Sequence, residues 1–335
     1  MSDRRPDLVG WSTIESDLWP ALRTFWHPVA YSSAVQPGPV GARLLGEHLV
    51  VVRLAGEVRC FRDLCVHRGT PLSLGWVDGS SLMCAYHGWE YDATGRCVRI
   101  PALPPDRAIP TKARTPTYRV REQNGLVWVC LGEPAAEIAP FPEFDTPEYT
   151  TYEAPVLART CSAARQLENF MDESHFAWVH EGILGDRLHA EAPAFDVTRE
   201  GHELRFGWDE RPNAIHPPGH RRDYRVGLPF TVHLRQHRHG GSDVETLYFA
   251  VCPSDARDSV GFLLVARNYG LPSEEEARRR DLTATVGAQD KRIVEAQRPE
   301  EVPFDLAAEL HIKGPDSAAV AYRRAMTDLG VQVDA

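Results

Sequence analysis

Two short segments, each with one cysteine and one histidine, constrain this chain most strongly. Cys65-Val66-His67 is followed, after sixteen residues, by Cys84-Ala85-Tyr86-His87. Thiolates and imidazoles both bind metals. A tetrahedral zinc ion could accept two of each, but zinc ligands usually come as Cys-x2–4-Cys and His-x3–5-His. Two mixed pairs suit a [2Fe–2S] cluster, in which one iron takes both cysteines and the other takes both histidines.

Glycines and an indole follow these pairs directly. Gly69 and Gly88 lack a Cβ, so backbone N–H groups could approach the cluster sulfides closely. We expect Trp89 to cover the cluster, although a core position explains this indole equally well. The other five cysteines are expected to be buried small apolar residues rather than ligands: Cys60, Cys97, Cys130, Cys161 and Cys252.

A second group of polar residues lies on a predicted helix over residues 163–179. Asn169, Asp172 and His175 are spaced by three residues and would share one helix face. His180 follows five residues after His175, about 140° further round an ideal helix. Both histidines could bind one ion only if the helix bends, bulges or ends between them. Without further evidence, two histidines at this spacing are more often solvent-exposed or part of the core than metal ligands.

The cysteine and histidine motifs resemble those of the Rieske non-haem iron oxygenases. Respiratory Rieske proteins carry an extra cysteine in each loop, where this chain has Gly69-Thr70 and Gly88-Trp89. The run from Asn169 to His180 is similar to the mononuclear-iron motif of the same family. The resemblance implies that four residues hold a [2Fe–2S] Rieske cluster: Cys65, His67, Cys84 and His87.

The resemblance also implies a mononuclear Fe(II) held by His175, His180 and a distant acid. We assign that acid to Asp290, because residues 289–297 are similar to the family's Asp-x4-Glu-x-Gln signature. Glu295 is the rival ligand, with a helix-surface charge as its alternative role. Two imidazoles and one carboxylate on one face of the iron leave positions open for O2.

Further roles follow from the same resemblance. Asp172 would accept hydrogen bonds from His175 and from a cluster histidine, His87, of a neighbouring subunit, with a surface charge as the alternative. Asn169 would lie near the iron as a weak ligand or water-orienting group, with a buried capping amide as the alternative. The chains would form a homotrimer.

A chain of 335 residues resembles the single-subunit branch of the family. That branch mostly hydroxylates or oxidatively demethylates small organic molecules, often aromatic or polycyclic, with O2 and two electrons. No G-x-G-x-x-G follows a predicted strand, so we expect a separate NAD(P)H-dependent reductase, with or without a ferredoxin. The alternatives are a Rieske electron carrier without oxygenase activity and a cis-dihydroxylating ring dioxygenase.

The pattern along the chain predicts an α+β protein of two domains. Short apolar runs and turns, including Asn124-Gly125, predict an all-β Rieske domain over residues 1–138. After a proline-rich connector, residues 139–335 predict a helix-grip-like catalytic domain with an antiparallel sheet and helices. Ser273 is the predicted N-cap of a helix running towards Gln297, and a last helix is predicted over 317–329.

Composition excludes some functions and leaves the substrate open. A formal net charge of −10 argues against nucleic-acid binding, and no apolar run is long enough to span a membrane. Residues 1–6 have no apolar segment of a signal peptide, and seven scattered cysteines favour the cytoplasm. An alternating strand could form a cationic pocket wall or a solvated sheet face: His233, Arg235, His237 and His239. The candidate pocket aromatics are Trp178, Trp208, Phe230 and Tyr248.

Overall fold

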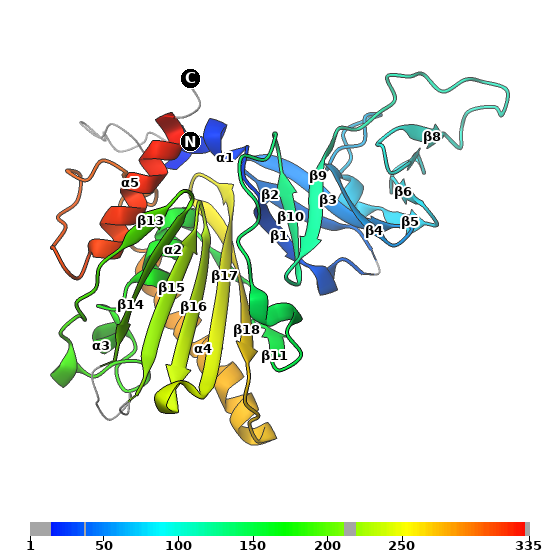
Figure 1. Ribbon diagram of the computed structural model, residues 1–335. Helices are drawn as coiled ribbons and strands as arrows, with labels where there is room; N and C mark the ends of the chain where they lie inside the picture. The colour runs from blue at the N-terminus through cyan, green and yellow to red at the C-terminus, as the bar shows by residue number, and fades with distance from the viewer. Residues whose placement is uncertain (1–14, 37, 211–218, 332–335) are drawn as a thin grey trace. The chain divides into compact units, whose positions relative to one another are not determined.

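The computed structural model describes residues 15–36, 38–210 and 219–331 and divides the chain into two compact units (Figure 1). One unit comprises residues 23–140 and 252–255, and the other comprises the remaining residues. Residues 1–6, in which no signal peptide is expected, lie outside the described part. No helix in the described ranges is both long and apolar enough to cross a membrane.

The smaller unit is built from two antiparallel sheets. In the larger sheet, the order β1-β10-β9-β4-β3-β2 brings together strands His27–Tyr31, Leu126–Cys130, Thr117–Gln123, Glu57–Arg62, Glu47–Leu54 and Val40–Leu44. The smaller sheet has the order β5-β6-β7-β8, with strands Trp76–Asp78, Ser81–Met83, Glu90–Tyr91 and Cys97–Arg99. The expected Asn124-Gly125 turn joins β9 to β10, and both residues have the positive φ of a two-residue hairpin.

The larger unit is an eight-stranded antiparallel sheet with helices packed on it. Its path is β11-β18-β17-β16-β15-β14-β13, and β12 also pairs with β18. These strands are Thr150–Glu153, Asp258–Arg267, Asp243–Asp255, Thr231–Arg238, Arg221–Gly227, Glu203–Asp209 and Thr198–Glu200, with β12 at Leu157–Arg159. The helices of this unit include α2 (Ala163–Met171), α3 (Phe176–Val179), α4 (Ser273–Val294) and α5 (Ser317–Val331). Helix α2 packs on β16 and β18 and contacts α4.

Three local predictions need correction. The predicted helix over 163–179 is interrupted, because α2 ends at Met171 and α3 starts only at Phe176. Ser273 is the first residue of α4 rather than its N-cap, because Pro272 takes the cap position in extended conformation. Residues 15–22 fall within the predicted Rieske domain, but their contacts place them in the larger unit.

Glu15 explains that last difference. Its carboxylate is 1% exposed and accepts the N–H groups of Ala163 and Ala164 at the start of α2, at 3.1 and 2.9 Å. The first N–H groups of a helix need external acceptors, so the N-terminal segment completes α2. Burial raises the pKa of Glu15 to about 7, although hydrogen bonds from Ser162 and Ala164 lower it.

This buried carboxyl predicts a pH-dependent stability. Between its ordinary pKa of 4.5 and about 7, Glu15 keeps a proton in the folded chain that it has lost in the unfolded chain. Its contribution to the free energy of unfolding should therefore fall by roughly 3 kcal/mol as pH rises through this range. In urea denaturation, the unfolding free energy of wild type minus that of Glu15→Gln should therefore decrease as pH rises. The 79%-exposed Glu137→Gln serves as control; a wild-type–Glu15→Gln difference that does not vary with pH would refute the prediction.

Candidate metal centres and substrate cavity

The break after α2 positions the first histidine. Asp172 leaves the helix with extended backbone (φ −82°, ψ 131°), and its carboxylate accepts the N–H groups of Ser174 and His175 at 2.9 and 3.2 Å. The next turn, α3, separates His175 from His180, which lie at its two ends. The helix ends between the two histidines, as the five-residue spacing required, because α3 stops at Val179 and His180 has non-helical backbone angles (φ −118°, ψ 34°).

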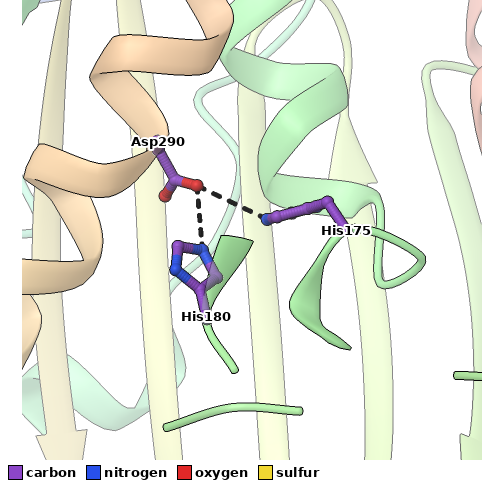
Figure 2. Close-up of side chains that lie close together, drawn as sticks. All are labelled: His175, His180 and Asp290. Carbon is purple, nitrogen blue, oxygen red and sulfur yellow. Dashed lines mark ion pairs between the residues drawn. The ribbon is translucent and has the colours of Figure 1, made fainter. Parts of the chain in front are cut away.

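His175, His180 and Asp290 come together in the larger unit (Figure 2). Asp290 Oδ1, on α4, lies 2.9 Å from His180 Nε2 and 3.4 Å from His175 Nε2. One ligand atom from each residue lies within 4.8 Å of the others. This is the only such group of three among the residues that the structure describes, and the buried His180 Nε2 makes no hydrogen bond. Two imidazoles and a carboxylate around an unsatisfied buried nitrogen fit a mononuclear iron.

Each histidine is oriented through its second ring nitrogen. His175 Nδ1 donates to Asp172 Oδ2 at 2.8 Å, and His180 Nδ1 donates to Gln289 Oε1 at 2.8 Å. Because both acceptors lie on the Nδ1 side, Nε2 is the nitrogen free to bind a metal. Gln289 was not identified from the sequence. Its position next to Asp290 is the one signal that could have pointed to it.

The charges of the group favour a bound cation. Burial raises the pKa of Asp290, but the adjacent His175 and His180 outweigh it and bring the pKa down to about 2. Burial lowers the pKa of His175, but Asp172 and Asp290 outweigh it and raise the pKa to about 9. Two carboxylates are thus kept ionised around buried imidazoles, which suits a divalent metal.

Of the two other candidate residues, Asn169 lies at the edge of this group and Glu295 lies outside it. Asn169 Nδ2 lies 3.5 Å from both His175 Nε2 and Asp290 Oδ1, at the edge of the group. Glu295, the rival ligand, instead accepts the Thr160 N–H at 2.8 Å and pairs with Lys291. It lies outside the group because its position at the C-terminus of α4 directs it to β12 and its neighbouring loop.

A cavity of about 430 Å³ opens onto the histidines and Asp290. Sheet strands β15 to β18 and helix α4 supply much of its wall. Its apolar lining includes Tyr152, Phe170, Phe176, Tyr224, Leu234 and Leu247. A largely apolar cavity of this size with a few polar groups is typical of a small-molecule site.

The four candidate pocket aromatics do not line the cavity, and three of them are core residues, which was the alternative. Trp208, Phe230 and Tyr248 are buried in the core and Trp178 is 60% exposed, and none lines the cavity. Alternation along a strand fixes that residues share a face but does not say what covers that face.

The alternating residues of β16 do not form a cationic wall. His233 is buried with its Nε2 2.9 Å from Glu143, and Arg235 donates to the Tyr149 hydroxyl at 3.2 Å. The solvated-face alternative therefore fails for His233 too. His237 does line the cavity, and the side chain of His239 lies outside the described part of the chain.

The two Cys–His loops of the smaller unit have the same backbone geometry. Each cysteine N–H donates to a carbonyl five residues later, Cys65 to Thr70 at 2.8 Å and Cys84 to Trp89 at 2.9 Å. Gly69 and Gly88 return N–H bonds to the cysteine carbonyls, both at 2.9 Å, with φ of +74° and +66°. This left-handed backbone favours glycine, which gives these two glycines a structural reason.

The four predicted cluster residues pair by type. His67 and His87 are exposed neighbours with ring centroids 4.6 Å apart, whereas Cys65 and Cys84 are buried. Burial and the nearby Cys65 raise the pKa of the Cys84 thiol, so holding both as thiolates requires positive charge. Cysteines on one side and histidines on the other fit the two irons of a [2Fe–2S] cluster.

Two aromatic residues surround these loops. The Trp89 ring stacks on His67 with centroids 4.6 Å apart, as expected for a residue that covers the cluster. The buried Tyr91 hydroxyl lies 3.1 Å from Cys65 Sγ and can donate a hydrogen bond to a thiolate there. Tyr91 was missed in the sequence, where it is one of several aromatic strand residues.

Two parts of the chain match known protein families. Residues 25–119 match the Rieske [2Fe-2S] domain, and residues 159–332 match the vanillate O-demethylase oxygenase C-terminal domain. Methylxanthine N1-demethylase NdmA of Pseudomonas putida is 33% identical over 320 residues, covering 92% of this chain and 89% of NdmA. The chain belongs to the Rieske non-haem iron oxygenases.

Two further comparisons extend over most of this oxygenase. Methylxanthine N3-demethylase NdmB of Pseudomonas putida is 32% identical, covering 84% of this chain and 83% of NdmB. The structure of Pseudomonas putida NdmA with caffeine superimposes with a TM-score of 0.85 at 32% identity, covering 94% of this chain and 93% of NdmA.

Membership of this family confirms the predicted fold class, enzyme class and cofactors. The oxygenase uses a [2Fe–2S] Rieske cluster, a mononuclear iron and O2 to hydroxylate or oxidatively demethylate a small organic substrate. Oxygenase components of this kind take electrons from a separate reductase and are multimeric. The zinc-site and simple electron-carrier alternatives are therefore excluded.

The Tyr91 hydroxyl predicts a measurable effect on the cluster. A hydrogen bond to a ligand sulfur stabilises the more negative, reduced state. Tyr91→Phe should lower the reduction potential by on the order of 50 mV, or ~1.2 kcal/mol for one electron, in a spectroelectrochemical titration. Tyr118→Phe, at a tyrosine of β9 outside both Cys–His loops, is the control. An unchanged potential in Tyr91→Phe would show that this hydroxyl does not act on the cluster.

Proposed function

We propose that this oxygenase is an oxidative demethylase that removes a methyl group from nitrogen in a small organic molecule. The observation that carries the proposal is the His175–His180–Asp290 group at the wall of an apolar cavity, in a chain similar over most of its length to two methylxanthine demethylases. The reaction takes an N-methyl compound, O2, two electrons and two protons to the N-hydroxymethyl compound and water. This carbinolamine then breaks its C–N bond, and the products are the N–H compound and formaldehyde.

His175, His180 and Asp290 are the proposed ligands of the mononuclear iron, and Cys65, His67, Cys84 and His87 those of the cluster. When bound, the iron supplies the position for O2 and the cluster supplies an electron. The protein holds the imidazoles in place: Asp172 and Gln289 fix the two Nδ1 protons, so that neither ring can turn its Nε2 away. The apolar wall excludes water from the reacting carbon.

The proposed function predicts formaldehyde release. Purified oxygenase with a reductase and NADH should consume caffeine, or another N-methyl compound of a panel, and release one formaldehyde for each O2. His175→Ala should keep the visible cluster spectrum and lose activity by more than about 100-fold, because the iron loses a ligand. A ring-hydroxylated or cis-diol product with no formaldehyde would overturn the proposal.

The assembly that we propose is a homotrimer supplied by an NAD(P)H-dependent reductase, with or without a ferredoxin, in the cytoplasm. All seven cysteines are unpaired thiols in the structure, which suits a reducing compartment. In the trimer, Asp172 would link His175 to His87 of the neighbouring subunit. The Asp172 side chain is 37% exposed and His87 is exposed, so both are accessible to another chain. A repeated head-to-tail contact closes into a ring.

The bridge is tested by Asp172→Asn. This variant is close in size but is a weaker acceptor, so it should keep both metal centres and the trimer while turnover falls by at least about tenfold. Stopped-flow oxidation of the reduced cluster measures the electron-transfer step directly. Asp186→Asn, at another acid that accepts from a nearby histidine, is the control. Near-normal cluster oxidation in Asp172→Asn, or a fully active monomer in light scattering, would contradict the bridge.

A further inference from the structure

The charged residues that line the cavity are already paired. Each of the five lining arginines has a carboxylate partner among the described residues. The pairs are Arg221–Asp223 (2.7 Å), Arg222–Glu173 (3.0 Å), Arg238–Glu245 (3.2 Å), Arg278–Glu275 (2.9 Å) and Arg279–Glu245 (2.9 Å). His237 is likewise 3.1 Å from Asp223. A carboxylate ligand would therefore lose its hydration without gaining an uncommitted arginine.

The most buried of these pairs makes an anion still less favourable. Arg222 is 5% exposed and contacts two carboxylates, those of Glu173 and Glu210. Glu210 lines the cavity and Glu173 lines the adjoining pocket, so the charge of Arg222 is already balanced. An anionic substrate entering here would gain little attraction from Arg222.

Three aromatic residues of the cavity wall already use one ring face on a partner. The Arg222 guanidinium lies 5.2 Å from the Phe176 ring centroid, and the Arg280 guanidinium lies 4.5 Å from that of Tyr152. Phe170 stacks on Phe249 with centroids 4.6 Å apart. A ring that already holds a guanidinium on one face stabilises a second cation less, because the two positive charges repel each other.

Gln236 places an uncharged amide in the cavity. Gln236 faces Arg222 on β15 and Glu245 on β17 in the strand register, and all three side chains line the cavity. Its amide makes no hydrogen bond with any described residue. The amide offers both donor and acceptor and carries no charge.

We infer that the cavity selects uncharged substrates and that Gln236 is a specificity-determining residue, hydrogen-bonded to a carbonyl or N–H edge of the substrate. The inference rests on the proposed function and narrows its substrate to neutral N-methyl compounds with such an edge. A site built to hydrogen-bond a polar edge discriminates strongly against molecules that lack it.

Three N-methyl probes of one skeleton test the inference: 1-methylindole-3-carboxamide (neutral), 1-methylindole-3-carboxylate (anionic) and 1-methylindole-3-methanamine (cationic at neutral pH). Calorimetric titration of the iron-loaded holoenzyme should give a Kd for the carboxamide at least about tenfold below those of the other two. Gln236→Leu should weaken carboxamide binding by about tenfold. Gln123→Leu, at a glutamine of β9 in the smaller unit, should leave binding unchanged.

A variant that should bind the anionic probe more tightly provides a second test. Glu245→Gln removes the carboxylate from Arg238 and Arg279 and should tighten binding of the carboxylate probe by at least about threefold. The inference is overturned if wild type binds the carboxylate or the amine as tightly as the carboxamide, or if folded Gln236→Leu binds the carboxamide like wild type. If Gln236→Leu does not fold, the relative affinities of wild type for the three probes still test the inference. Absence of formaldehyde from every probe would count against the proposed function but not against this binding preference.

Discussion

The carboxylate of Asp172 is the contact on which the mononuclear site depends. It accepts the backbone N–H groups of Ser174 and His175, which stabilises the turn after α2, and it also accepts His175 Nδ1–H. One side chain therefore both stabilises the turn after the helix and orients His175, the first proposed iron ligand. Because α3 then ends at Val179, His180 leaves the helix, and both imidazoles lie near Asp290 although an ideal helix would direct them about 140° apart.

The rest of the larger unit supports this arrangement. Glu15 completes the N-terminus of α2, and Gln289, on α4, orients His180 next to Asp290. The sheet beneath supplies an apolar row, with Tyr224, Leu234 and Leu247 opposite one another, and the next row outward is polar. The cavity is thus apolar in one row, where a methyl group can be desolvated, and polar in the next, where a substrate can be oriented.

Much of this could be predicted from the sequence because ligand residues have strict chemical requirements. The Cys–His pairs, the His175–His180 spacing and the need for an interrupted helix are local patterns, and Asp290 followed from its family signature. The residues that were missed act through tertiary contacts. Tyr91, Gln289 and Glu15 each meet a partner between 26 and 149 residues away, and no local pattern marks them. The prediction for β16 was wrong for the same reason. Alternation places His233 and Arg235 on one face, but only the fold shows that Glu143 and Tyr149 cover this face.

We propose that one ion is held by His175, His180 and Asp290, independently of the cluster. The most direct test measures iron and acid-labile sulfide per chain in wild type, Asp290→Ala and Glu295→Ala. Wild type and Glu295→Ala should contain about three irons and two sulfides, and Asp290→Ala about two irons with the sulfide unchanged. Full iron in Asp290→Ala, or loss of the third iron from Glu295→Ala instead, would contradict the account.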